Sequence, residues 1–224
     1  KPYLPKARHA VIDVHVHDYP GRAKGKKPKD ALAEWVNTQR EAGVNTSVIL
    51  TGVTGDEFDK LAEFYLGAFP DQFQLYCGVE KADIVKPDYP QRSVAELERC
   101  YKIGARGVGE LSDKGFGFSR DKRLDADKRL HADDARLDPF WIKCAELRLP
   151  VNVHIADHPS SWQPPDVFQE RTPVFQRFNQ HADQGRSYEE LVASLPRLVA
   201  KHPKTTFIAC HLANLGHDYD RLEK

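Results

Sequence analysis

The chain has 224 residues, enough for a single-domain hydrophobic core, and its 33 basic and 33 acidic side chains give a formal net charge of zero. A neutral chain has no overall field to recruit nucleic acid or an anionic membrane, and no apolar run forms a membrane span or signal peptide. The four cysteines are scattered among apolar neighbours, which predicts buried, reduced thiols without disulfides. Because the chain begins with lysine and lacks methionine, we expect the natural N-terminus to lie outside this sequence.

Residues 10–17 alternate apolar and polar side chains, the pattern of a β-strand whose successive side chains point to opposite faces. Asp13, His15 and His17 therefore share one face. Two residues along a strand span about 6.6 Å, so both imidazoles can lean onto one metal ion at about 2.1 Å. The pattern predicts a two-ligand metal clamp, and a hairpin strand with solvated histidines is the alternative.

The rest of the chain alternates predicted helices and strands. Apolar spacing, capping residues and helix-ending Gly or Pro predict helices over 31–42, 56–69, 93–103, 138–149 and 187–201, and the start of one at 218–224. Apolar and β-branched runs predict strands over 44–51, 73–79, 105–111, 150–155 and 205–211. Ser93 with Glu96, and Ser187 with Glu190, match the capping box, and Asp138 predicts a helix start.

Six repeats of strand and helix imply parallel strands joined by crossover helices. A doubly wound sheet and a (β/α) barrel both satisfy this pattern, and periodicity alone does not choose between them. Either way, the sequence predicts one domain over residues 1–224.

Two predicted connections are unusually long. Residues 112–137 contain charge-dense repeats, which favour a solvated surface. Residues 156–186 carry several aromatic side chains among four prolines. Because loops of this length in a compact domain are commonly lids or disordered segments, the aromatic content favours a lid-like insertion that packs.

Titratable side chains occupy the carboxyl end of four predicted strands. In parallel α/β folds the strand-to-helix loops at that end gather ligands and catalytic residues. One such histidine is commonly a satisfied core residue, but a group of five donors at one rim favours a metal site. Imidazoles with a carboxylate suit Zn²⁺ or a similar divalent transition metal. The five residues are His15, His17, Glu110, His154 and His211.

Four segments carry a family resemblance: Ile-Asp-Val-His-Val-His at 12–17, Gly-Val-Gly-Glu-Leu at 107–111, Val-Asn-Val-His at 151–154 and Phe-Ile-Ala-Cys-His-Leu-Ala-Asn at 207–214. In order and spacing they resemble the amidohydrolase superfamily. The most similar branch is amidohydrolase-2, whose relatives include aminocarboxymuconate-semialdehyde decarboxylase. The resemblance implies an α/β fold of the (β/α)8 TIM-barrel type, with the last two strand–helix units missing from this sequence.

The resemblance also implies roles for the strand-end residues. His15, His17 and His154 would bind a divalent metal, most readily zinc with manganese as the alternative, as one or two ions. His211 would be a ligand to a second metal or the catalytic residue that orients and activates the attacking water. Glu110 would be a ligand, as in two-metal members, or would instead bond to a neighbouring loop. The family's last strand supplies a metal-binding, proton-accepting aspartate, which we expect beyond residue 224.

These features predict a metal-dependent hydrolase that acts on a small-molecule amide, lactone or ester through metal-activated water. Asp13 would hold a ligand histidine from behind, with a backbone partner as its alternative role. Trp162 and Phe168 would close over the substrate. Metal-dependent, non-oxidative decarboxylation of a small aromatic or enoic acid is one alternative, and a catalytically silent barrel-fold binding protein is another.

The expected partner is a small molecule, with neither nucleic acid nor membrane. Lys114, Arg171 and Arg177 would pair with a substrate carboxylate, or are ordinary surface charges. The neutral charge and the lack of a basic stripe disfavour a nuclease. The sequence does not determine the oligomeric state, and a homo-oligomer is one possibility. It does not determine the compartment either, although it favours the cytoplasm.

Overall fold

The computed structural model describes residues 8–17, 25–119, 121, 124–164 and 185–223. The strands are β1 (Val11–Val16), β2 (Val44–Leu50), β3 (Phe73–Cys77), β4 (Ala105–Asp113), β5 (Val151–Ile155) and β6 (Phe207–Ala209). The helices are α1 (Pro28–Ala42), α2 (Gly55–Tyr65), α3 (Tyr89–Ile103), α4 (Asp138–Glu146), α6 (Tyr188–Lys201) and α7 (Tyr219–Leu222). This order confirms the predicted alternation of strands and helices.

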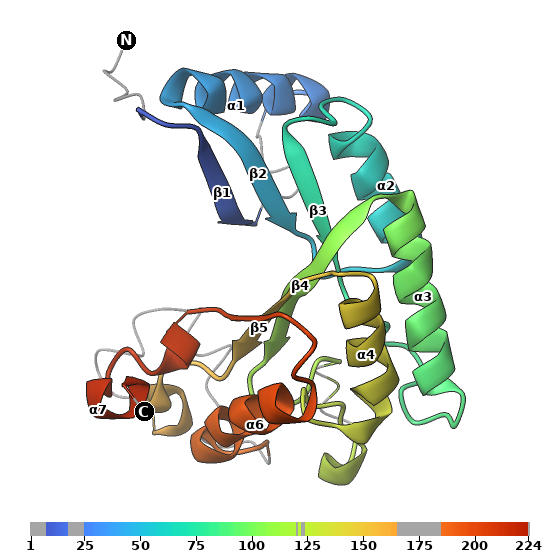
Figure 1. Cartoon of the computed structure of the whole chain (residues 1–224), viewed down its shortest axis with the longest axis vertical. Helices are drawn as coiled ribbons and strands as arrows, with labels where there is room; N and C mark the ends of the chain where they lie inside the picture. Colours follow the sequence, from blue (N-terminus) through green and yellow to red (C-terminus); the bar gives the residue numbers. More distant parts are fainter. Residues whose placement is uncertain (1–7, 18–24, 120, 122–123, 165–184, 224) are drawn as a thin grey trace.

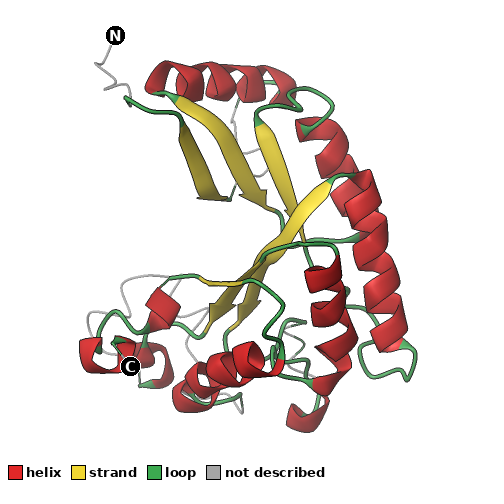
Figure 2. Ribbon diagram, viewed as in Figure 1, coloured by secondary structure: helices red, strands yellow, loops and turns green. Residues whose placement is uncertain are grey.

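The six strands form one parallel sheet in which spatial order follows chain order from β1 to β6. The sheet curls, and helices α1 to α4 and α6 lie along its convex side (Figures 1 and 2). A doubly wound sheet reverses its strand order at a switch point, and no reversal occurs between β1 and β6. The fold is therefore a half-barrel of the predicted (β/α) barrel type.

The core fills the space between the convex side of the sheet and its helices. Phe58 of α2, Leu97 of α3 and Trp141 of α4 are almost fully buried there, beside Leu75 and Val108 of the sheet. All four cysteines are free and buried, as predicted. Burial of this apolar layer fixes the strands, so the loops at their carboxyl ends are held on a rigid scaffold.

Two helix starts follow the sequence closely. Ser187 and Glu190 form the predicted capping box, in which each side chain binds the other residue's backbone N–H. α4 begins at Asp138, but the Asp138 carboxylate does not cap it. That carboxylate instead accepts hydrogen bonds from Lys201 and His202, so it ties α4 to the end of α6.

The predicted capping box of Ser93 and Glu96 is wrong. α3 already begins at Tyr89, with a proline in its first turn, so Ser93 lies inside the helix and donates its hydroxyl to the Pro90 carbonyl. Glu96 accepts the backbone N–H of Gly55 across the gap to α2. The helix therefore starts at Tyr89, next to this proline, and not at Ser93.

The connection after β4 is more ordered than its charge runs predict. β4 itself extends to Asp113, and Phe116, Phe118 and Leu130 of the following segment are buried. Asp125, Asp127 and Lys128 are exposed, which agrees with a solvated surface. Arg129 is the exception, since its guanidinium is buried over the Phe116 ring. The buried Phe116 and Phe118 rings therefore hold this segment against the fold, although its charged residues alone predict a solvated loop.

Strand β6 is shorter than predicted and ends at Ala209. His211 thus lies two residues beyond the strand, in a backbone with φ of 120°. The sheet ends at β1 and β6, and the outward side chains Ile12 and Val14 of β1 are 59% and 63% exposed. Within the described residues, no helix covers that apolar face of β1.

Candidate metal centre

A glutamate lies at the centre of the predicted cluster. Glu110 of β4 places its Oε1 atom 3.4 Å from His15 Nε2 and its Oε2 atom 3.5 Å from His17 Nε2. The two imidazole nitrogens are 3.2 Å apart. His15 of β1 and His17, the residue after it, therefore lie on one face, as the alternation of this segment predicts.

The same carboxylate also approaches His154 of β5 and His211 of the turn after β6. His154 Nδ1 lies 3.2 Å from Glu110 Oε1, and His211 Nε2 lies 2.9 Å from it. The His154 and His211 rings meet edge to face, with centroids 4.6 Å apart. The structure thus brings together all five residues that the sequence proposes as metal ligands.

Gly109 makes the close approach of β4 to β5 at this point sterically feasible. Its φ is +142°, and a Cβ atom there would lie 2.7 Å from the Asn152 Cβ atom. A side chain at this position would push the two strands apart. The glycine before Glu110 therefore lets the carboxylate reach the β5 histidine.

The charges of the cluster favour an ionised glutamate. Burial alone raises the pKa of Glu110, but hydrogen bonds with His154 and His17 outweigh it and hold that pKa well below its usual range. The hydrogen bond with Glu110 raises the pKa of His17. Burial lowers the pKa of His15 despite the attraction of Glu110. The ionised Glu110 carboxylate and the imidazoles around it therefore form a set of donors that suits a cation.

An aspartate that the sequence reasoning missed supports His154. Asp157 Oδ1 lies 3.1 Å from His154 Nε2 and 2.7 Å from Lys114 Nζ. Burial lowers the pKa of His154, but hydrogen bonds with Asp157 and Glu110 outweigh it and raise the pKa overall. Because Asp157 holds one ring nitrogen, the other faces Glu110. The signal in the sequence was an acidic residue three positions after a strand-end histidine.

The remaining predicted site residues have mixed outcomes. Asp13 is exposed and its carboxylate accepts the backbone N–H of His15 at 3.4 Å, so its contact is with backbone and not with an imidazole ring. Trp162 is half-buried and donates its indole N–H to the Arg186 carbonyl. Lys114 pairs with Asp157, as described above. Phe168, Arg171, Arg177 and most of the predicted lid lie outside the described residues.

The donor atoms fit a divalent transition metal. Ligand atoms about 2.1 Å from a tetrahedral centre are about 3.4 Å from one another. The separations among His15, His17 and Glu110 are 3.2, 3.4 and 3.5 Å. Donor atoms of His15, Glu110, Cys210 and His211 also lie within 4.8 Å of one another. The sequence predicts Cys210 only as a buried, reduced thiol, because a single cysteine carries no ligand-spacing signal.

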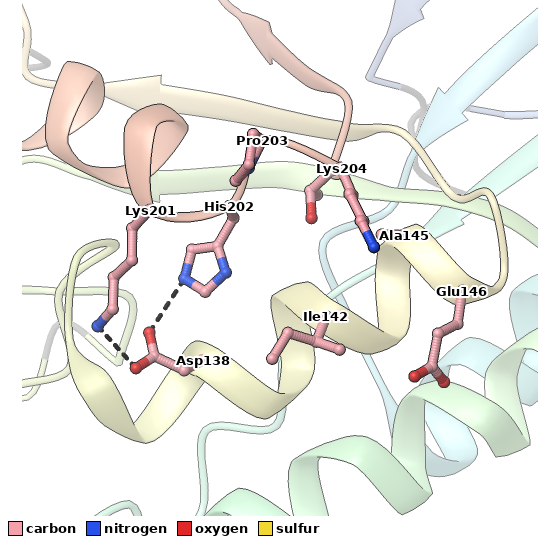
Figure 3. Close-up of a pocket in the computed structure, with 9 residues that line it drawn as sticks. Asp138, Ile142, Ala145, Glu146, Lys201, His202, Pro203 and Lys204 are labelled. Carbon is pink, nitrogen blue, oxygen red and sulfur yellow. Dashed lines mark hydrogen bonds and ion pairs between the residues drawn. The ribbon is translucent and has the colours of Figure 1, made fainter.

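A separate cavity of about 560 Å³ opens between α4 and the turn that leads into β6 (Figure 3). Asp138, Ile142, Lys201 and Lys204 are among its lining residues. It precedes β6, whereas the histidines follow the strands, so the cavity lies at the opposite end of the half-barrel. None of the predicted metal ligands lines it.

A parallel half-barrel with imidazoles and a carboxylate at the carboxyl ends of its strands defines an enzyme-type α/β barrel with a candidate metal centre. The sequence matches the amidohydrolase family Amidohydro_2 over residues 12–224, and the chain belongs to this family. The family is generally metal-dependent, in agreement with the donor group found here.

Solved structures share the fold. The 2,6-dihydroxybenzoate decarboxylase from Rhizobium matches with a TM-score of 0.55 and 16% identity, over 94% of this chain and 68% of that chain. A 2,6-dihydroxybenzoate decarboxylase complexed with 2,6-dihydroxybenzoate matches with a TM-score of 0.54 and 17% identity, over 95% and 69%. A candidate amidohydrolase from Staphylococcus aureus matches with a TM-score of 0.55 and 16% identity, over 94% of this chain and 70% of that chain. No curated protein matches the chain by sequence.

Proposed function

We propose that this protein is a metal-dependent hydrolase of a small-molecule amide, lactone or ester. The observation that carries the proposal is the convergence of four histidines on the Glu110 carboxylate, within 2.9 to 3.5 Å. Such a set of fixed nitrogen and oxygen donors is characteristic of zinc hydrolases.

The cation in this proposal is zinc, with manganese as the alternative. His15, His17, Glu110 and His154 would hold it, and His211 would add a donor to a second ion or act on the substrate side. When bound, a divalent ion supplies Lewis-acid polarisation of the scissile carbonyl and activates water at neutral pH.

His211 and Glu110 would have different roles in the reaction. His211 has the most exposed side chain of the four histidines, 44% against 37% for His17, 29% for His15 and 13% for His154. It therefore faces the substrate side, where its Nε2 atom can orient water or donate to the developing oxyanion. Glu110 would be occupied as a metal ligand, so we assign the proton-transfer role to His211, whose side chain is the most exposed of the four histidines.

Other residues would bind the substrate. Lys114 lies beside the cluster through its pairing with Asp157, where its ammonium group can attract a substrate carboxylate. Trp162 would form one wall of the substrate site, since its indole is fixed by the Arg186 carbonyl. Phe168 would contribute from the predicted lid.

Metal-dependent decarboxylation of a small aromatic acid is the second candidate. Two of the solved structures that share the fold are 2,6-dihydroxybenzoate decarboxylases. Both reactions would use the same donors. Carbon dioxide release from hydroxybenzoates and enoic acids, measured beside ester and lactone hydrolysis, separates the two candidates.

The test begins with protein purified free of metal. Zinc or manganese is then titrated, with bound metal and turnover of an amide, ester and lactone panel as readouts. We expect His15→Ala with His17→Ala to abolish metal binding and turnover, while His9→Ala, at an exposed position before β1, retains both. If the double variant still bound metal at full stoichiometry, the proposed metal centre would be wrong.

The partner in this proposal is a small molecule. None of the helices in the described part of the chain is both long and apolar enough to cross a membrane.

A further inference from the structure

Cys210 differs from the other cysteines in its surroundings. Cys77, Cys100 and Cys144 belong to the apolar core between the sheet and the helices. The Cys210 sulfur instead lies within 4.8 Å of donor atoms of His15, Glu110 and His211. Its thiol is therefore the one cysteine side chain within the described residues that faces the candidate metal centre.

The position of this thiol is fixed by the backbone. Cys210 directly follows β6, and its N–H donates to the Val153 carbonyl at 3.0 Å, so strand pairing continues for one residue beyond the strand. Only 4% of the residue is exposed. The sulfur is held inside the cluster by the fold and is not placed there by a mobile loop.

The neighbours of the sulfur are polar. The sulfur lies near the Glu110 carboxylate and beside the side chain of Asn152. Asn152 is itself 2% exposed, and its Oδ1 atom has no hydrogen-bond partner in the described structure. A buried sulfur whose polar neighbour Asn152 has an unpartnered oxygen is an unusual setting for a purely structural cysteine.

We propose that Cys210 is a metal ligand, which supplies a thiolate to the cation held by His15 and Glu110, beside the His211 imidazole. This inference rests on the proposed metal centre and adds the nature of its sulfur donor. On binding, the sulfur–metal bond forms while the thiol proton passes to bulk solvent.

A thiolate changes which cation the site prefers. Soft sulfur donors select zinc, cobalt and cadmium, whereas manganese and magnesium favour oxygen-rich sites. The proposal therefore predicts a cadmium-over-manganese preference that depends on residue 210. Cys210→Ser keeps the size and the polar character of the side chain, and it should reduce this preference by about tenfold or more.

The test loads the metal-free chain with cobalt(II) and records the near-ultraviolet spectrum beside the bound stoichiometry. We expect a sulfur-to-cobalt charge-transfer band in the wild-type chain and in Cys144→Ala, a control in the apolar core. Cys210→Ser should bind cobalt(II) without this band. Cobalt bound to the wild-type chain without the band overturns the sulfur ligand and leaves the metal centre standing.

A second measurement needs no variant. X-ray absorption of the zinc-loaded wild-type chain should include one sulfur scatterer at about 2.3 Å beside the nitrogen and oxygen ligands. A shell of nitrogen and oxygen alone overturns the proposal. Failure of the wild-type chain to bind either zinc or cobalt overturns the metal centre and the sulfur ligand together.

Discussion

Glu110 Oε1 and His211 Nε2 lie 2.9 Å apart although 101 residues separate them in the chain. The contact spans β4 and the turn after β6, so it forms only when the sheet curls. Its consequence is a carboxylate held among imidazoles at one rim of the half-barrel.

Removal of the Glu110 charge should weaken metal binding more than it weakens the fold. Glu110→Gln preserves the side-chain shape but removes the anion that faces four imidazoles, so we expect zinc affinity to fall by about 10- to 100-fold. Competition with a chromophoric chelator measures this change. Glu57→Gln, on the exposed side of α2, is the matched control and should bind as the wild-type chain does.

Asp157 should act on metal binding through the orientation of His154. Asp157→Asn keeps the size of the side chain and weakens its hold on His154 Nε2, so we expect about a tenfold loss of zinc affinity. Lys114→Met removes a charge that hydrogen-bonds to Asp157 but leaves the Asp157 carboxylate in place, so its effect on affinity should be smaller. Equal losses in both variants would contradict a positioning role for Asp157.

Metal binding should stabilise the folded chain. A ligand at about 100 times its dissociation constant adds about 2.7 kcal/mol to the free energy of unfolding. We therefore expect the thermal midpoint of metal-free protein to rise on addition of zinc and to return after chelation. The same titration of the His15→Ala, His17→Ala variant should leave its midpoint unchanged.

Acid should weaken the link between α6 and the segment after β4. Burial raises the pKa of Asp133, but hydrogen bonds from Arg197 and Arg186 outweigh it and lower that pKa overall. The stabilisation of the folded state by ionised Asp133 is therefore complete above the ordinary aspartate pKa of about 3.9. It is lost as pH falls through the lower pKa that Asp133 has in the folded chain. Because both arginines are partly exposed, we expect about 1 kcal/mol.

Asp133→Asn tests this contribution. The variant should unfold at lower urea concentration than wild type at pH 7, and the difference should shrink towards pH 2. A constant difference across that range would assign the loss to packing instead of charge.

The cap of α6 should contribute measurably to stability. Ser187 accepts the Glu190 N–H, and Glu190 accepts the Ser187 N–H in return. Ser187→Ala removes one half of this box, so we expect a loss of about 1 kcal/mol in the free energy of unfolding. Urea denaturation followed by circular dichroism measures it. Ser93→Ala at the wrongly predicted cap should cost less, since Ser93 lies inside α3 and its hydroxyl donates only to the Pro90 carbonyl.

The sequence by itself determined the alternation of strands and helices, because apolar periodicity is a local property of each segment. It also indicated the five donor residues, since the polar side chains stand at the ends of otherwise apolar strands. The capping box at Ser187 was predictable for the same local reason. The error at Ser93 arose where two local signals competed and the proline start prevailed.

Only the tertiary structure decided which side chains meet. The strand order from β1 to β6, and with it a half-barrel instead of a doubly wound sheet, follows from how the helices pack on one side of the sheet. The central place of Glu110, the support of His154 by Asp157, and the approach of Cys210 all join distant segments. Spacing along a chain does not encode such contacts, because they depend on the curl of the sheet and on which side chains its burial leaves facing inward.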